Sequence, residues 1–97
     1  MYDVKRRIDD NINLMVPWYL MTSYLYYKCH ESIISDEQYD WLCTEILSKW
    51  DDIKHPHKKY IDKDSLSAGT GYTLNEYPER VKGAAKAVLG NVNNVEW

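Results

Sequence analysis

The stretch ISDEQYDWL, residues 34–42, decides the fold of this chain. It contains the S-x-x-Q pattern of a capping box, in which the Ser35 hydroxyl accepts from the backbone N–H of Gln38 and the Gln38 side chain reaches back to the N–H of Ser35. Ile34 before the cap and Tyr39 inside the helix can form the hydrophobic staple that often accompanies such a box. We therefore predict that a helix begins directly after Ser35.

Apolar residues at helical spacing carry this predicted helix toward residue 54. The side chains that we expect it to bury are those of Leu42, Ile46, Trp50 and Ile53, with Tyr39 and Cys43 beside them. His55 precedes Pro56, and a residue before proline is disfavoured in the α region. The helix should therefore end near Lys54, and residues 55–74, which are rich in Pro, Gly, Ser and Thr, should form loops.

Two helical segments precede this one. Residues 3–15 form a polar amphipathic pattern whose apolar positions are Val4, Ile8, Ile12 and Met15. Pro17 then either kinks one long helix or begins a new one. Beyond it an apolar stripe resumes, comprising Trp18, Met21, Leu25 and Cys29. Residues 30–34 form a connector, and we expect the helices on either side of it to form an antiparallel pair.

A C-terminal helix is predicted over about residues 78–89. Pro78 suits the first turn of a helix, and Gly90 is a favourable stop. The apolar stripe of this segment consists of Val81, Ala84, Ala85 and Val88. We expect residues 91–97 to form a loose tail. The predicted fold is therefore all-α, a single helical domain over residues 1–97 with an antiparallel helix pair plus a C-terminal helix.

The composition is that of a small globular protein. Hydrophobic residues make up 44% of the 97 residues and charged residues 28%, which is unlike a disordered chain. A net charge of −3 gives no basic footprint for direct binding to duplex DNA. The sequence has no apolar run of membrane-spanning length and no signal peptide, so we expect a cytoplasmic protein without membrane contact.

Candidate binding residues occur on both helices of the predicted pair. Three of them lie three and four positions apart in the first turns of the second helix: Asp36, Tyr39 and Asp40. They project to one side, where carboxylates and a phenol can hold ribose hydroxyls. The first helix offers three rings that can stack on a flat heterocycle: Tyr24, Tyr26 and Tyr27. Structural roles stay open for both groups, because the helix dipole favours acidic residues in a first turn and tyrosines pack well in cores.

Other chemistry has no matching motif. The chain has neither a G-x-S-x-G elbow nor a G-x-x-x-x-G-K phosphate loop. Its histidines and cysteines lack the spacing of a zinc site, so we predict no metal. The two cysteines lie among helical apolar residues, which favours buried thiols over a disulfide framework.

The two segments with candidate binding residues together resemble a known family. YLYY, residues 24–27, then ISDEQYDWL, residues 34–42, and then Glu45 are similar to the signature of the N-terminal domain, domain Ia, of bacterial NAD-dependent DNA ligases. That signature reads approximately Y-x-Y-H, a short connector, I-S/P-D-x-x-Y-D-x-L and a downstream glutamate. Weaker similarities to the family's H-P and D-S-P…V-G elements follow at residues 54–56, 64–65, 69 and 71. The resemblance covers about residues 19–71.

The resemblance implies that the chain holds the nicotinamide mononucleotide (NMN) half of NAD. Carried over by position, Tyr26 would stack on the nicotinamide ring. The other expected cofactor-binding residues, for the ribose, phosphate or carboxamide, are Tyr27, Asp36, Tyr39 and Asp40. Tyr27 stands where the family has a phosphate-contacting histidine, and Leu66 replaces a proline. The chain also lacks the K-x-D-G motif whose lysine accepts AMP, so we expect no enzymatic activity from this chain alone.

Two functions remain open at this point. The first is a stand-alone domain Ia-like protein that binds NAD or NMN, or that complements a separate ligase catalytic chain. The second is a small, phage-encoded interaction or inhibitor protein that keeps the fold and binds a host protein. The Tyr and Trp content fits the second, since those residues are enriched at binding hot spots. The sequence leaves the oligomeric state open.

Overall fold

The computed structural model of the chain describes residues 4–8, 11–69 and 77–94. Within these ranges the regular elements are all helical and no strand occurs, so the predicted all-α class is confirmed. The α-helices are α1 (Val4–Ile8), α2 (Met15–Lys28), α3 (Asp36–Ser48), α4 (Lys63–Ser67) and α5 (Glu79–Asn94). Two 3₁₀ helices, η1 (Ile12–Leu14) and η2 (Pro56–Tyr60), lie between them.

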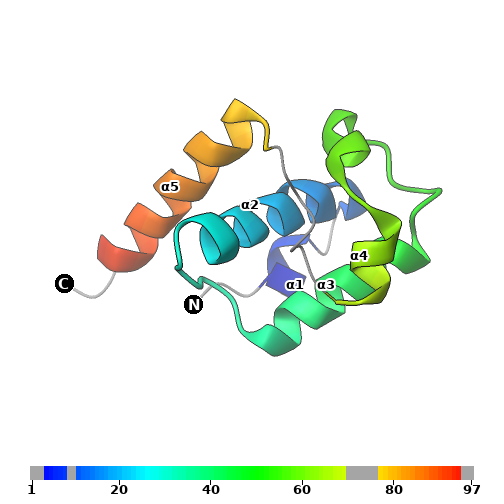
Figure 1. Ribbon diagram of the computed structural model, residues 1–97, viewed down its shortest axis with the longest axis horizontal. Helices are drawn as coiled ribbons and strands as arrows, with labels where there is room; N and C mark the ends of the chain where they lie inside the picture. The colour runs from blue at the N-terminus through cyan, green and yellow to red at the C-terminus, as the bar shows by residue number, and fades with distance from the viewer. Residues whose placement is uncertain (1–3, 9–10, 70–76, 95–97) are drawn as a thin grey trace.

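Helix α2 lies at the centre of the fold and contacts both α3 and α5 (Figure 1). Helices α2 and α3 run in opposite directions, and α5 packs on α2, so the predicted helix pair with a C-terminal helix is present. Nine of the 14 residues of α2 are buried. They include Tyr19, which lies off the predicted stripe and is fully buried, because a helix covered on several sides buries more than one face.

The capping pattern at Ser35 begins α3 as predicted. The Ser35 Oγ accepts from the backbone N–H of Gln38 at 3.1 Å, and α3 starts at the next residue, Asp36. Asp36 and Glu37 occupy the first turn, where the helix dipole favours negative charge.

The predicted end of this helix near Lys54 is wrong, because α3 ends at Ser48. The chain turns after Ser48, and this turn still places Ile53 in the core, where its side chain is fully buried. The spacing of apolar residues therefore continues beyond the end of the helix. The Nζ of Lys58 donates to the carbonyls of Trp50 and Ile53, the latter at 3.2 Å. The Lys58 side chain thus satisfies carbonyls that a longer helix would otherwise have bonded. The spacing of apolar residues along the chain cannot indicate such a contact.

The predicted helix over residues 3–15 is also interrupted. Asn11 has an extended backbone with φ −154°, and its side chain accepts from the N–H of Asn13 at 3.0 Å. Such a local side-chain bond competes with helical hydrogen bonding. A new helix then starts at Met15, so Pro17 lies in the first turn of α2 rather than at a kink.

Residues 55–74, predicted to be loops, contain both η2 and α4. The Asp62 carboxylate caps α4 by accepting from the N–H of Asp64 at 3.0 Å. Leu66 supplies the buried apolar side chain that packs this short helix into the core, and α4 contacts α3. Residues 70–76 of the predicted loop lie outside the described ranges.

Helix α5 begins one residue after Pro78 and continues past Gly90, the predicted stop, to Asn94. Residues 91–94 of the predicted loose tail are therefore helical, and residues 95–97 lie outside the described ranges. Val81 and Ala85 are buried, whereas Ala84 of the predicted stripe is exposed. In the described part of the chain, no helix combines the length and apolarity needed to cross a bilayer.

Candidate functional site

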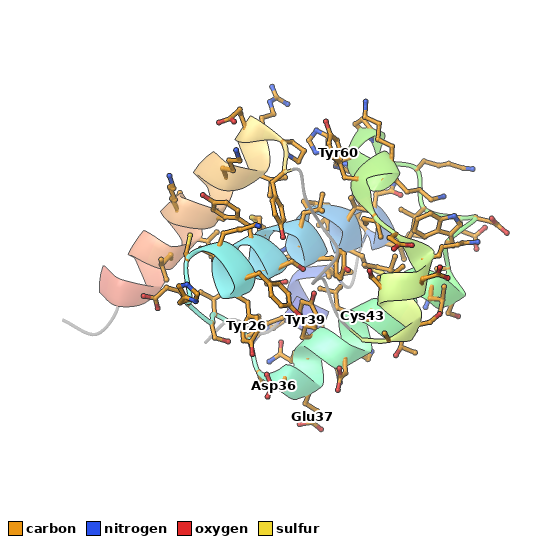
Figure 2. All side chains as sticks on the ribbon, in the orientation of Figure 1. Tyr26, Asp36, Glu37, Tyr39, Cys43 and Tyr60 are labelled. Atoms are coloured by element: carbon orange, nitrogen blue, oxygen red, sulfur yellow. The ribbon has the colours of Figure 1, made fainter. Side chains whose placement is uncertain are left out.

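A pocket of about 220 Å³ lies where the C-terminal end of α2 meets the start of α3. All five candidate cofactor-binding residues line it: Tyr26 and Tyr27 from α2, and Asp36, Tyr39 and Asp40 from α3. Figure 2 shows Tyr26, Asp36 and Tyr39 together at this end of the helix pair, well away from Tyr60. Two segments that are separated by a connector in the sequence thus converge on one cavity.

The two tyrosines of α2 form an aromatic pair at the pocket. Their rings pack edge to face, with centroids 4.9 Å apart and planes at 82°. Tyr26 is 53% exposed, so much of its ring is accessible to a ligand. Tyr24, the third candidate ring, packs edge to face on Tyr77 instead, with centroids 5.2 Å apart, and belongs to the core side of α2.

Tyr39 lines the pocket but uses its hydroxyl within the protein. The phenol oxygen lies 2.6 Å from the Oγ of Ser23 in a side-chain hydrogen bond. Its ring stacks on Tyr19 with centroids 5.7 Å apart and planes at 29°. Burial, and then the neighbouring Tyr19, raises the pKa of the Tyr39 phenol well above its usual range. The side chain is therefore a neutral, fixed wall that joins α3 to α2.

The two carboxylates are differently placed. Asp36 and Asp40 are both exposed, and neither carboxylate has a hydrogen-bond or ion-pair partner within residues 4–8, 11–69 and 77–94. Ionised carboxylates accept hydrogen bonds only. Among the described residues that line the pocket there is no Lys, Arg or His. The pocket is therefore acidic, with acceptors available to the hydroxyls of a ligand.

Gly69 is a lining residue that the sequence did not single out for binding. It follows the last turn of α4 with φ +69°, a conformation that costs a side chain-bearing residue energy. A Cβ at this position would lie 3.2 Å from the Oδ1 of Asp40, so glycine also lets the backbone approach the carboxylate. The closeness of Gly69 to Asp40 joins residues far apart in the chain, so local patterns do not indicate it. The one sequence signal for Gly69 was its match to the glycine of the family's V-G element.

Thr22 also lines the pocket and was missed. It lies four residues before Tyr26 in α2, and this spacing places both on one helix face. The Thr22 hydroxyl donates to the carbonyl of Trp18 at 2.7 Å, so its polar atom serves the helix and its methyl group is left for packing.

A second, more open hollow of about 370 Å³ adjoins the first and shares Tyr26, Tyr27 and Ser32 with it. His30 and Glu31 complete its lining. His30 has φ 57°, a left-handed conformation in the connector that turns the chain from α2 toward α3. The aromatic pair thus stands between two cavities.

The chain matches no protein-family model, no curated protein and no solved structure. Within the described ranges, no three His, Cys, Asp or Glu side chains gather to form a metal site. Cys43, behind Asp40 on α3, is buried, and this burial together with the Asp40 charge raises its thiol pKa to about 12. A protonated thiol is a poor nucleophile. The site therefore offers an exposed aromatic ring from Tyr26 and carboxylate acceptors from Asp36 and Asp40.

Proposed function

We propose that this chain is a binding module that holds the NMN half of NAD in the pocket between α2 and α3. The observation that carries the proposal is the convergence of Tyr26, Tyr27, Asp36, Tyr39 and Asp40 on one cavity. The likeness to ligase domain Ia selects these residues from the sequence alone, and the cavity gives them a common place to act.

The size of the pocket supports binding of part of a dinucleotide. Small-molecule sites usually measure about 300–1,000 Å³, whereas this pocket measures about 220 Å³. It suits a ring and its ribose, and the AMP half would project outward. A separate nucleotidyltransferase chain would then take that AMP half, as the resemblance to the ligase domain implies.

Each pocket residue has a physical role in this proposal. The exposed ring of Tyr26 stacks on the nicotinamide, and Tyr27 braces it edge to face. The carboxylates of Asp36 and Asp40 accept hydrogen bonds from the ribose hydroxyls. Tyr39 acts as a positioning residue, since its hydroxyl is bonded to Ser23.

Isothermal titration calorimetry with NAD, NMN and AMP tests the proposal. NAD and NMN should bind and AMP should not, because AMP lacks the nicotinamide. Replacing Tyr26 by Ala should weaken NMN binding about tenfold, the effect of losing one stacked base. Asp36→Asn should also weaken binding. Its matched control is Glu37→Gln, since Glu37 shares the first turn of α3 but points away from the pocket (Figure 2).

A failure to bind any nicotinamide compound would refute this proposal. Equal binding of AMP and NMN would do so as well, because it would show that the nicotinamide is not recognised.

The exposed aromatic pair supports a second candidate function, a protein-interaction module. Tyr26 is one of two large hydrophobic side chains that are exposed in the described part of the chain, the other being Leu14. Tyrosine is enriched among the residues that contribute most to binding at protein interfaces, and exposed apolar patches can mark such interfaces. A photo-crosslinking residue at position 26 tests this function. A stoichiometric complex that Tyr26→Ala abolishes, in a chain that binds no nicotinamide compound, would favour it over the first.

A further inference from the structure

From the charge of the pocket we infer that its preferred ligand is a positively charged, phosphate-free nicotinamide nucleoside, the oxidised riboside. This preference rests on the proposed function and names the form of the ligand that the site selects. The oxidised nicotinamide ring carries a positive charge, and its reduced form is neutral. The mononucleotide adds a phosphate with negative charge to the same nucleoside.

The two carboxylates favour the cation. Asp36 and Asp40 line the pocket without a partner among the described residues. The attraction between a positive charge and one carboxylate about 4 Å away, in water-like surroundings, corresponds to an increase in affinity of about fivefold. The cationic riboside is therefore expected to bind about fivefold or more tightly than its neutral, reduced form.

The tyrosine pair favours the same charge. Tyr26 is 53% exposed, and a cation above the face of such a ring is attracted by the ring's negative quadrupole. Tyr27 packs with its ring at 82° to that of Tyr26, so the pair offers one aromatic face and one perpendicular wall. A flat cationic ring fits this arrangement better than a neutral ring of the same shape.

The described residues that line the pocket offer a phosphate no fixed positive charge. The described lining residues include no Lys, Arg or His, and the neighbouring hollow adds only Glu31 and His30 as ionisable groups besides its tyrosines. The positive end of the α3 dipole would attract an anion. However, Asp36 and Glu37 already occupy its first turn, and Ser35 takes the N–H of Gln38.

A titration followed by amide NMR with three probes tests the inference: oxidised nicotinamide riboside, reduced nicotinamide riboside and NMN. The oxidised riboside should bind most tightly, about fivefold or more above each of the other two. Raising KCl from about 20 mM to about 500 mM should reduce this preference, because salt screens the carboxylates.

The double variant Asp36→Asn with Asp40→Asn should abolish the preference for the cation. A matched control, Glu37→Gln with Asp51→Asn, removes the same charge from exposed positions outside the pocket lining and should retain it. If the double variant does not fold, the salt dependence of the wild-type preference still tests whether the carboxylates cause it.

The outcomes separate the two claims. If NMN binds as tightly as the oxidised riboside, or the reduced riboside does, the inference is overturned while the proposed function stands. If none of the three probes binds, the proposed function itself fails. A preference that does not change with salt would also overturn the inference, since it would not come from the carboxylates.

Discussion

The hydroxyl of Ser23 and the phenol of Tyr39 lie 2.6 Å apart and join α2 to α3 beneath the pocket. Ser23 is fully buried, and a buried hydroxyl without a partner is costly. Each hydroxyl thus satisfies the other. The bond fixes the angle at which α3 presents its first turns, and with them Asp36 and Asp40, to the pocket.

Removal of the Tyr39 hydroxyl should destabilise the fold. Tyr39→Phe leaves the Ser23 hydroxyl without this partner, and we expect the free energy of unfolding to fall by about 1–2 kcal/mol. The matched control is Tyr77→Phe, because the Tyr77 hydroxyl is buried and has no hydrogen-bond partner within residues 4–8, 11–69 and 77–94; its loss should be neutral or stabilising. Urea unfolding measures both. Equal losses in the two variants would contradict the role of the Ser23–Tyr39 bond.

Two glycines should respond to alanine in opposite ways. Gly69→Ala imposes φ +69° on a residue with a Cβ and crowds the Asp40 carboxylate, so we expect a loss of about 1–2 kcal/mol. Gly83 lies within α5, where an added Cβ would meet no described group within 4 Å apart from its chain neighbours and the nearby backbone of its own helix. Gly83→Ala should therefore stabilise by about 0.5–1 kcal/mol. Thermal unfolding compares them. A stable Gly69→Ala variant that keeps wild-type NMN affinity would show that the approach to Asp40 is unimportant.

His55 should make stability depend on pH. Burial, and then the neighbouring His57, lowers the pKa of His55, and its Nδ1 caps η2 by accepting from the N–H of His57 at 3.1 Å. The unfolded chain therefore takes up the proton more readily. The stability that neutral His55 contributes is complete above pH about 6.5 and is lost as the pH falls through its lower folded pKa.

The urea midpoint of the wild type should consequently fall between pH about 7.5 and pH about 5.5. His55→Asn keeps a capping side chain without a titrating group and should show a smaller change. His30→Asn, which removes an exposed histidine, is the control and should behave as the wild type. If His55→Asn keeps the pH dependence of the wild type, His55 is not the cause of the change in stability with pH.

The two cysteines should differ in reactivity. Cys43 is buried, and its thiol pKa is raised to about 12, so at pH about 8 it holds almost no thiolate. Cys29 is only partly buried. Maleimide labelling of the folded protein should modify Cys29 alone, and the Cys29→Ser variant should react only in urea. Fast labelling of that variant without urea would show that Cys43 is accessible.

The sequence predicted the features that depend on neighbours along the chain. The capping box places the start of α3 because Ser35 and Gln38 meet through local geometry. The helix class and the sharing of one helix face by Asp36 and Asp40 likewise follow from spacing. The convergence of Tyr26 with these residues needed the family resemblance as well, since spacing along one helix does not show which side chains of α2 face α3.

The errors lie where distant residues decide. The end of α3 was placed too late because Ile53 continues the apolar period from within a turn whose carbonyls bond to Lys58. The short helix α4 was missed because packing against α3, rather than its five residues, stabilises it. The closeness of the Gly69 backbone to the Asp40 carboxylate was missed because it, too, depends on the packing of residues far apart in the chain.

Intermolecular NOEs between oxidised nicotinamide riboside and the protein test the central claim most directly. The account predicts NOEs from the pyridinium protons to the ring protons of Tyr26 and Tyr27, and shifts of the backbone amides of Asp36, Asp40 and Gly69. NOEs that place the riboside elsewhere on the protein would contradict it, as would spectra that stay unchanged up to millimolar riboside.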